Sequence, residues 1–318
     1  MGIVFPLELP PKSRILIAGA GGGFDVICGL PIAMALEAAG HHVEFANYSL
    51  TDLRNVVNGH WHNERLLEIT SESYLKIGDY FPEKLLALWC KEKCKSERSI
   101  YCFAHGGVQP TLASYRYLIE QLNIDTVICV DGGIDGLFRG DECDLGTPSM
   151  DSISVVSAAL CNVDRKFYCM TAFGIEGAES NVSHGLALRR IAELVREGGF
   201  FGVGSVIKET PVGQNFLSAV NYIYNYLPSH RQSVIVSSIV AAIQGDFGRT
   251  VVHPKTENSP PWLSPLTQLI WYFDAVKVAQ LKLFYQDILE TVEVGEVAEA
   301  IEKVRSRYGV KEFERIPI

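Results

Sequence analysis

The side chains best suited to chemistry are concentrated in one short segment, residues 131–142. The segment contains four carboxylates and one arginine, namely Asp131, Asp135, Asp141, Glu142 and Arg139. It follows directly on an apolar, β-branched run at 126–130, which predicts a strand buried on both faces. Ligands of open α/β sheets bind outside the carboxyl ends of such strands. Because neighbouring carboxylates repel one another unless a cation or ligand hydroxyls offset their charge, the segment predicts a ligand site.

The polar residues of this segment suit different roles. Asp131 and Asp135 could act as catalytic carboxylates, hold substrate hydroxyls, or bind a divalent cation such as Mg²⁺. Arg139 could bind a carboxylate or a phosphate through two parallel hydrogen bonds. The other residues expected to contact the ligand are Gly132, Gly133, Asp141 and Glu142. The simpler alternative is a solvated acidic turn in which Asp131 caps nearby backbone amides.

A second candidate site is the glycine-rich segment between the predicted strand 14–18 and the predicted helix 24–39. Backbone amides there could approach an anion near the start of the helix. Gly21, Gly22 and Gly23 are expected to hold the anionic part of a ligand. Asp25 is also expected to contact the ligand, although it sets a negative charge where a pyrophosphate would lie. The dinucleotide-binding pattern is incomplete, because Phe24 occupies its third glycine position and the second strand ends in Asn47 instead of an acid. Nicotinamide binding is therefore disfavoured, and a tight strand-to-helix turn is the simpler alternative.

Two further strand ends carry groups that could transfer protons. His105 and Gly106 follow the predicted strand 100–104, where a histidine is placed either for catalysis or for a structural hydrogen bond. Gly106 is expected to contact the ligand. Glu176 and Glu179 follow the predicted strand 166–172, with His184 just beyond them. A glutamate beside the acidic segment would have a raised pKa and would suit acid–base chemistry. Alternatively, these glutamates only stabilise a helix N-terminus.

Other potential metal ligands are few. His60 and His62 alternate within a polar stretch whose Asn and Gly neighbours favour a loop. Cys90 and Cys94 have no second pair of ligands to complete a zinc site. The remaining cysteines are scattered, and several lie in apolar contexts, as free thiols do in a reducing cytosol. Neither pair is expected to bind a metal.

The order of the predicted elements indicates the fold class. Short apolar strands alternate with helices, which predicts an α/β protein with a Rossmann-like, doubly wound, mostly parallel sheet and helices on both faces. We expect one domain over 1–318, with a core at about 13–253 that ends in an edge strand at 247–252, and a C-terminal helical segment at about 262–308. The aromatic residues expected in this segment's core contacts are Trp262, Trp271, Tyr272 and Phe273. A cover over the ligand site and a contact between copies of the chain are the alternatives.

Composition narrows the class of partner. The chain has 318 residues, a formal net charge of −9 and 47% apolar residues. Nucleic acid and anionic membranes are not expected partners, because both require clustered Lys and Arg. No apolar run reaches the ~18 residues of a membrane span, and residues 1–12 lack the pattern of a secretory signal. We therefore expect a cytoplasmic protein that binds a small molecule.

Many of these motifs occur together, in the same order, in a known family. Along the chain they are GGGFD at 21–25, LPIA at 30–33, YFPE at 80–83, VQP at 108–110, VDGGID at 130–135, RGDE at 139–142, LGTP at 145–148, SPL at 264–266 and WYFD at 271–274. Through them the chain resembles a family of prokaryotic proteins classed as a domain of unknown function. The resemblance implies one Rossmann-like domain and brings no reaction or ligand with it.

The sequence favours an enzyme that acts on a small nucleotide- or sugar-phosphate-like ligand. Hydrolysis or group transfer is the expected reaction, because carboxylates and a glycine turn suffice for it without a redox cofactor. In this interpretation Asp131, Asp135, His105 and Glu176 are catalytic. The main alternative is a non-catalytic ligand-binding or sensing protein that uses the same site. A structural subunit of a homo-oligomer, built on the aromatic segment, is a second alternative.

Overall fold

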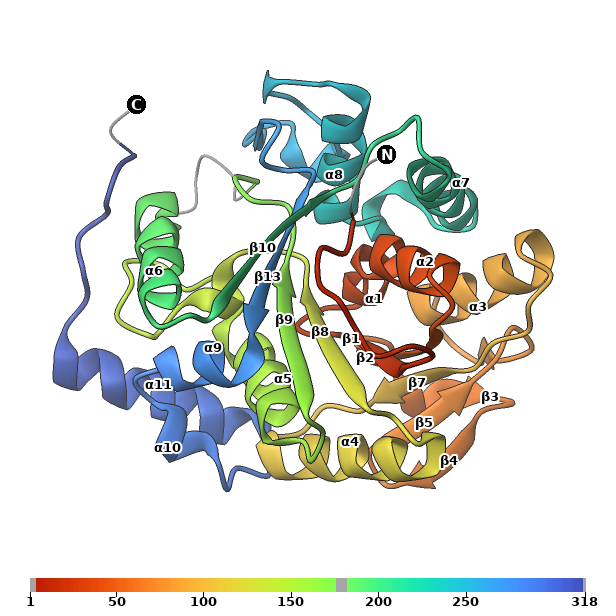
Figure 1. Cartoon of the computed structure of the whole chain (residues 1–318), viewed down its shortest axis with the longest axis horizontal. Coiled ribbons are helices and arrows are strands. Elements are labelled where there is room, and N and C mark those ends of the chain that lie inside the picture. The colour runs from red at the N-terminus through yellow and green to blue at the C-terminus, as the bar shows by residue number, and fades with distance from the viewer. Residues whose placement is uncertain (1–3, 176–181, 317–318) are drawn as a thin grey trace.

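The computed structural model describes residues 4–175 and 182–316, and its centre is a nine-stranded sheet (Figure 1). The strand order is β10-β13-β9-β8-β1-β2-β7-β5-β4. The parallel strands at its centre are β1 (Arg14–Gly19), β2 (His42–Tyr48), β7 (Ile100–Phe103), β8 (Thr126–Asp131) and β9 (Arg165–Met170). This confirms the predicted α/β class with a mostly parallel, Rossmann-like sheet.

The direction in which the chain adds strands reverses beside β1. From β1 the chain adds β2 and β7 on one side, and then crosses to add β8 and β9 on the other. The last residue of β1, Gly19, is level with Val130 of β8 and Asn47 of β2. The loops that follow these strands therefore leave the same edge of the sheet, at the switch point where open α/β sheets bind ligands.

The aromatic segment near the C-terminus is a strand, so the prediction of helices throughout 262–284 was wrong. Strand β13 (Leu269–Asp274) lies antiparallel between β9 and β10 (Phe200–Ser205). Its side chains alternate between two cores, with Ile270 and Tyr272 in one and Phe273 in the other. Burial of aromatic residues on both faces suits a central strand as well as a helix, so the apolar run alone was ambiguous. The helix α9 (Ala275–Leu281) begins only after Asp274, whose carboxylate accepts hydrogen bonds from its first amides.

Three other local predictions were wrong. The expected edge strand at 247–252 is only β11 (Gly248–Arg249), which pairs with β12 (Trp262–Leu263) in a separate small sheet. The edges of the main sheet are instead β10 and β4 (His60–Asn63), and β4 lies where a loop was expected. The helix expected at 24–39 is divided into α1 (Asp25–Cys28) and α2 (Leu30–Ala38). The division falls at Gly29, where a Cβ would lie only 2.6 Å from Cγ2 of Ile17 on β1.

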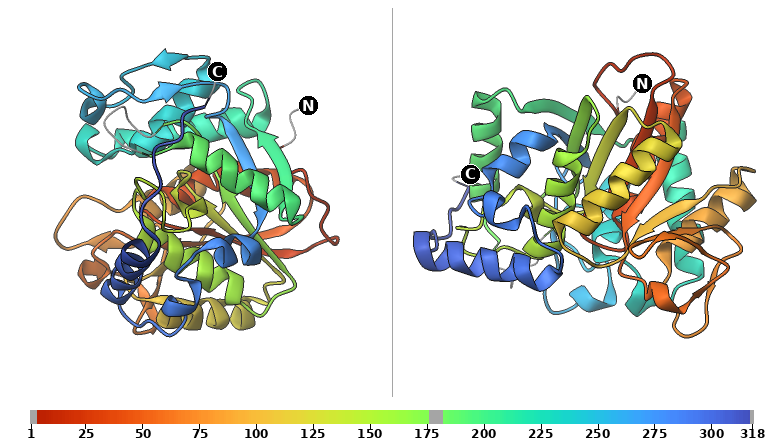
Figure 2. Two further views of the ribbon diagram at one scale, coloured as in Figure 1. Left: turned by 90° about the vertical axis from the view of Figure 1, so that its left-hand side faces the viewer. Right: turned by 90° about the horizontal axis from the view of Figure 1, so that it is seen from below.

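Helices cover both faces of the sheet (Figure 2). One core contains α1, α2, α3 (Pro82–Lys93), α7 (Pro211–Asn225) and α8 (Val234–Gln244). The other contains α4 (Val108–Leu122), α5 (Pro148–Leu160), α6 (His184–Arg196), α9, α10 (Tyr285–Ile288) and α11 (Val294–Tyr308). The remaining strands are β5 (Leu66–Ile69), which joins β4 to β7, and the pair β3 (Val56–Val57) and β6 (Tyr74–Leu75). Strand β1 shows the reason for two cores, because Ile15 and Ile17 face the first and Leu16 and Ala18 the second. Within the described residues, no helix is both long and apolar enough to cross a lipid bilayer.

Candidate functional site

Three buried aspartates from distant parts of the sequence meet at the switch point. They are Asp25 at the start of α1, Asp131 at the end of β8 and Asp151 in the first turn of α5. One carboxylate oxygen of each lies within 4.8 Å of the others. Their exposed fractions are only 8%, 3% and 2%. We call this group the aspartate triad.

Asp135 extends the triad on its more exposed side. The Thr147 hydroxyl lies 3.0 Å from Oδ2 of Asp135 and 3.1 Å from Oδ2 of Asp151. The Thr147 amide also donates to Oδ2 of Asp135 (2.8 Å). Asp135 is half-buried, so the group as a whole runs from the interior toward solvent.

The glycines around the triad leave space for its carboxylates. A Cβ on Gly21 would overlap Oδ1 of Asp151, and a Cβ on Gly136 would overlap Oδ2 of Asp131. A Cβ on Gly132 would lie 2.7 Å from Oδ1 of Asp25. The density of glycine in the two candidate segments is thus a requirement for bringing these carboxylates together.

The amides of the glycine turn bind a carboxylate of the protein itself. Gly21 and Gly22 donate their N–H groups to Oδ2 of Asp25, at 2.7 and 3.0 Å. Asn47, near the end of β2, donates to the Gly23 carbonyl (3.2 Å) and to the buried Glu83 (2.8 Å). The expectation that Gly21–Gly23 hold the anionic part of a ligand stays a prediction, although the amides of Gly21 and Gly22 bind Asp25.

Burial and mutual repulsion favour protonation of the triad. Burial, with a contribution from the charge of Asp135, raises the pKa of Asp25 to about 7 despite the hydrogen bonds from Gly21 and Gly22. Burial raises the pKa values of Asp131 and Asp151 well above their ordinary range, and the charge of Asp135 raises them further. The Tyr168 hydroxyl (2.5 Å) and the Gly136 amide (3.0 Å) donate to Asp131 and oppose this effect. These causes favour the protonated form of the triad, whereas a nearby cation would favour its charged form.

A buried lysine, Lys282, contacts the backbone of the acidic segment. Lys282 is 3% exposed, and its ammonium donates to the carbonyls of Gly136 (3.0 Å) and Phe138 (3.1 Å). Burial lowers the pKa of Lys282 below its ordinary value, although the charges of Asp151 and Glu142 oppose this effect. Lys282 thus fixes the loop after β8 and supplies positive charge close to the triad.

A cavity of about 450 Å³ opens beside Asp25, and we call it the triad cavity. Its walls include Gly22, Gly23, Tyr80 and the start of α8, residues 233–235. Three exposed basic side chains also line it, namely His230, Arg231 and Lys255. Arg231 pairs with Asp79 at 3.0 Å, and Lys255 makes no ion pair with any residue that the structure describes. Basic side chains and the N-terminal amides of an eleven-residue helix are both suited to an anion.

His105 lies in a neighbouring cavity of about 800 Å³, which we call the Trp61 cavity. The imidazole is exposed and stacks on the Tyr48 ring, with centroids 5.5 Å apart. Gly106 exchanges hydrogen bonds with the Tyr48 hydroxyl through both its N–H and its carbonyl. Leu50 lines both cavities, so they adjoin, but His105 is not a wall of the triad cavity.

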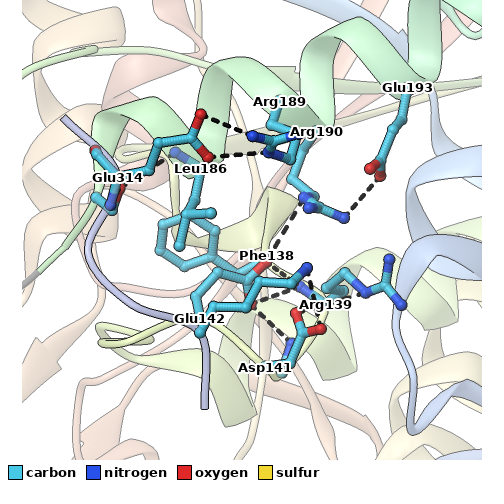
Figure 3. Close-up of polar contacts among 12 residues, drawn as sticks. Phe138, Arg139, Asp141, Glu142, Leu186, Arg189, Arg190, Glu193 and Glu314 are labelled. Atoms are coloured by element: carbon cyan, nitrogen blue, oxygen red, sulfur yellow. Dashed lines mark hydrogen bonds and ion pairs between the residues drawn. The ribbon is translucent and has the colours of Figure 1, made fainter. Parts of the chain in front are cut away.

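Arg139, Asp141 and Glu142 form a separate structural network (Figure 3). Glu142 is fully buried, accepts the amides of Arg139 and Gly140, and lies 3.8 Å from Nε of the buried Arg190 on α6. Asp141 pairs with Lys311 at 3.1 Å and lies 3.5 Å from Arg139. None of these three residues is among the described residues that line the two cavities, and their predicted role in ligand binding stays a prediction. They join the acidic segment, residues 131–142, to α6 and to the chain that follows α11. Figure 1 shows this last part of the chain passing beside α6.

The remaining candidate residues from the sequence are Glu176, Glu179, His184 and His62. Glu176 and Glu179 lie outside the described residues, so their predicted role stays a prediction. His184 begins α6 and packs against the Phe173 ring. His62 contacts Glu68 at 2.8 Å and the Tyr117 hydroxyl at 3.0 Å, which already engages both its ring nitrogens.

The sequence interpretation missed several residues that the structure brings to the site. Asp151 could have been found, because Pro148 opens a helix after the Gly146-Thr147 turn and so places Asp151 in its first turn. Lys282 and the basic residues of the triad cavity gave no such signal, since they lie far along the chain in segments with no chemical motif.

The fold and the triad define an α/β protein with an acidic site at the switch point of its sheet. The chain belongs to the family described as protein of unknown function (DUF1152), whose model matches residues 16–315. This confirms the family resemblance. No curated protein matches the sequence.

Proposed function

We propose that this protein is a Mg²⁺-dependent hydrolase or transferase that acts on a small nucleotide- or sugar-phosphate-like ligand. The observation that carries the proposal is the position of Asp25. Its carboxylate belongs to the aspartate triad and its residue also lines the triad cavity, where basic side chains are exposed. The proposed cation site and the proposed anion site would therefore share one wall.

The triad fits a hard divalent cation. Mg²⁺ prefers oxygen ligands and is bound in proteins by a few carboxylates together with substrate oxygens and water. Asp25, Asp131 and Asp151 would hold it, and the absence of a side chain at Gly21 leaves space for the Asp151 carboxylate beside the other two. When bound, the cation would neutralise the triad and withdraw charge from a phosphoryl group. Phosphoryl chemistry needs mainly such positioning and charge stabilisation.

The chain's own residues would orient the substrate and move a proton. Arg231 and Lys255 would bind phosphate oxygens, with the first amides of α8 beside them. Asp135 is half-buried at the outer side of the triad and would accept the proton of an attacking water or hydroxyl. Lys282 would hold the loop that carries Asp135 and Gly136.

The test measures Mg²⁺ binding by calorimetry and the release or transfer of phosphate from a panel of nucleotides and sugar phosphates. We expect Mg²⁺-dependent turnover, and a loss of Mg²⁺ affinity of more than about tenfold in Asp151→Asn. The exposed Asp164 provides the matched control, since Asp164→Asn removes the same charge away from the triad. Unchanged Mg²⁺ binding in Asp151→Asn would refute the metal site. Mg²⁺ and phosphate binding without any product would instead support the non-catalytic, ligand-binding alternative.

A further inference from the structure

The Trp61 cavity has no role in the chemistry proposed above, although it is the larger of the two adjoining cavities. Three separate segments form its walls: residues 49–54 after β2, residues 61–65 around the β4–β5 hairpin, and residues 104–105 after β7. The carboxyl ends of β2 and β7 therefore deliver residues to it, just as those of β1 and β8 deliver the triad. It occupies the next position along the same binding edge of the sheet.

The wall of this cavity combines an open aromatic face with unpaired charges. Trp61 is 40% exposed, although indole rings are usually largely buried. Arg54 and Glu64 are exposed, and neither makes an ion pair with another described residue. Asp52 adds an exposed carboxylate in the loop after β2, and its Oδ2 accepts a hydrogen bond from the Asn55 side-chain amide (2.6 Å). A tryptophan ring can stack on any nucleobase. Carboxylates accept hydrogen bonds from ribose hydroxyls.

We propose that the Trp61 cavity binds the nucleoside part of a nucleotide, with the base stacked on Trp61 and the ribose near Asp52. The inference rests on the proposed function for the position of the phosphates, which would lie in the triad cavity. Leu50 lines both cavities and is itself 41% exposed, so one ligand can contact both across this side chain. With a nucleoside site in the Trp61 cavity, the substrate class is nucleotides and not sugar phosphates.

The experiment compares ligands that occupy one cavity or both. Calorimetric titrations of the full chain with Mg²⁺ use adenosine, guanosine, cytidine and uridine 5′-monophosphates, ribose 5-phosphate, and inorganic phosphate. We expect at least one nucleoside monophosphate to bind about tenfold or more tightly than ribose 5-phosphate, which lacks the base. Trp61→Leu should remove about tenfold of the nucleotide affinity and leave the affinity for inorganic phosphate unchanged.

Two further variants make the result specific to the ring. Trp61→Phe keeps a stacking surface and should retain most of the nucleotide affinity. Trp262→Leu is the matched control, because Trp262 is 49% exposed and lies outside both cavities. The proposal is overturned if ribose 5-phosphate binds as tightly as every nucleotide, if no nucleotide binds, or if Trp61→Leu leaves nucleotide affinity unchanged.

Failure of this inference can be told apart from failure of the proposed function. Binding of inorganic phosphate and Mg²⁺ that depends on Asp151, with no effect of Trp61, would refute the nucleoside site alone. Nucleotide binding that depends on Trp61 but is unaffected by Mg²⁺ and by Asp151→Asn would refute the metal-dependent function and leave the nucleoside site standing.

Discussion

Gly21 and Asp151 occupy complementary space: a Cβ on residue 21 would overlap the carboxylate that Asp151 presents from helix α5. The glycine turn after β1 and the first turn of α5 can approach so closely only because residue 21 has no side chain. This approach completes the aspartate triad, because Asp25 lies immediately after the same turn. The relationship makes Gly21 a position where a single methyl group should disturb the site.

Gly21→Ala is expected to displace Asp151 and to weaken Mg²⁺ binding by more than about tenfold. Overpacking of this kind should also reduce the free energy of unfolding by about 1–3 kcal/mol, measured by urea denaturation. The neighbouring Gly22→Ala is the control, because a Cβ there would meet Oδ1 of Asp25 only at 3.9 Å, an ordinary contact. Equal effects of the two substitutions on Mg²⁺ binding would contradict this explanation.

The raised pKa of Asp25 predicts how the stability of the metal-free protein depends on pH. Since the folded-state pKa of about 7 exceeds the unfolded value, the native state holds a proton that the unfolded state releases. The contribution of this group to stability is thus full below about pH 4 and falls as the pH rises to about 7. Over this window the free energy of unfolding of wild type relative to Asp25→Asn should fall by on the order of 4 kcal/mol.

Urea denaturation in a chelating buffer, at several pH values, measures this difference directly. Asp164→Asn should run parallel to the wild type, because its carboxylate is exposed and lies outside the triad. If the difference between wild type and Asp25→Asn is the same at every pH, Asp25 does not hold a proton in the native state.

Mg²⁺ affinity should increase with pH between about 6 and 8, because the cation must displace protons from the triad. For each proton displaced, the affinity changes by up to about tenfold per pH unit. Calorimetry in buffers of different ionisation enthalpy counts the released protons. Affinity that is independent of pH would show that the triad is already ionised without the metal.

The buried ion pair of the acidic segment should affect stability and not metal binding. Arg190 and Glu142 are both fully buried, so Arg190→Ala leaves a buried carboxylate without its cationic partner and should cost roughly 3–5 kcal/mol of unfolding free energy. The adjacent Arg189 pairs with Glu314 at the surface, where solvent screens the interaction, so Arg189→Ala should cost far less than Arg190→Ala. At temperatures where both variants are folded, Mg²⁺ affinity should equal that of the wild type. A loss of Mg²⁺ binding in folded Arg190→Ala would show that this network supports the triad after all.

Much of the fold could be predicted because its signals are local. The apolar runs of β1, β7 and β8 and the glycine that follows β1 specify buried strands and a turn without reference to the rest of the chain. Strand β13 could not be predicted in this way, because aromatic residues buried on both faces have no period that separates a strand from a buried helix. Its position between β9 and β10 depends on which sheet edge is left open by residues much earlier in the chain.

The sequence by itself determined that Asp25 and Asp131 would lie at the same edge of a parallel sheet, because the loops after neighbouring parallel strands must leave at one edge. Only the tertiary structure decided which other acids would join them. Asp141 and Glu142 are close to Asp131 in sequence, yet their carboxylates pair with Lys311 and Arg190, whereas Asp151 is brought to the triad by the packing of α5. The direction of a side chain depends on the local backbone and on the element docked against it, and spacing along the chain fixes neither.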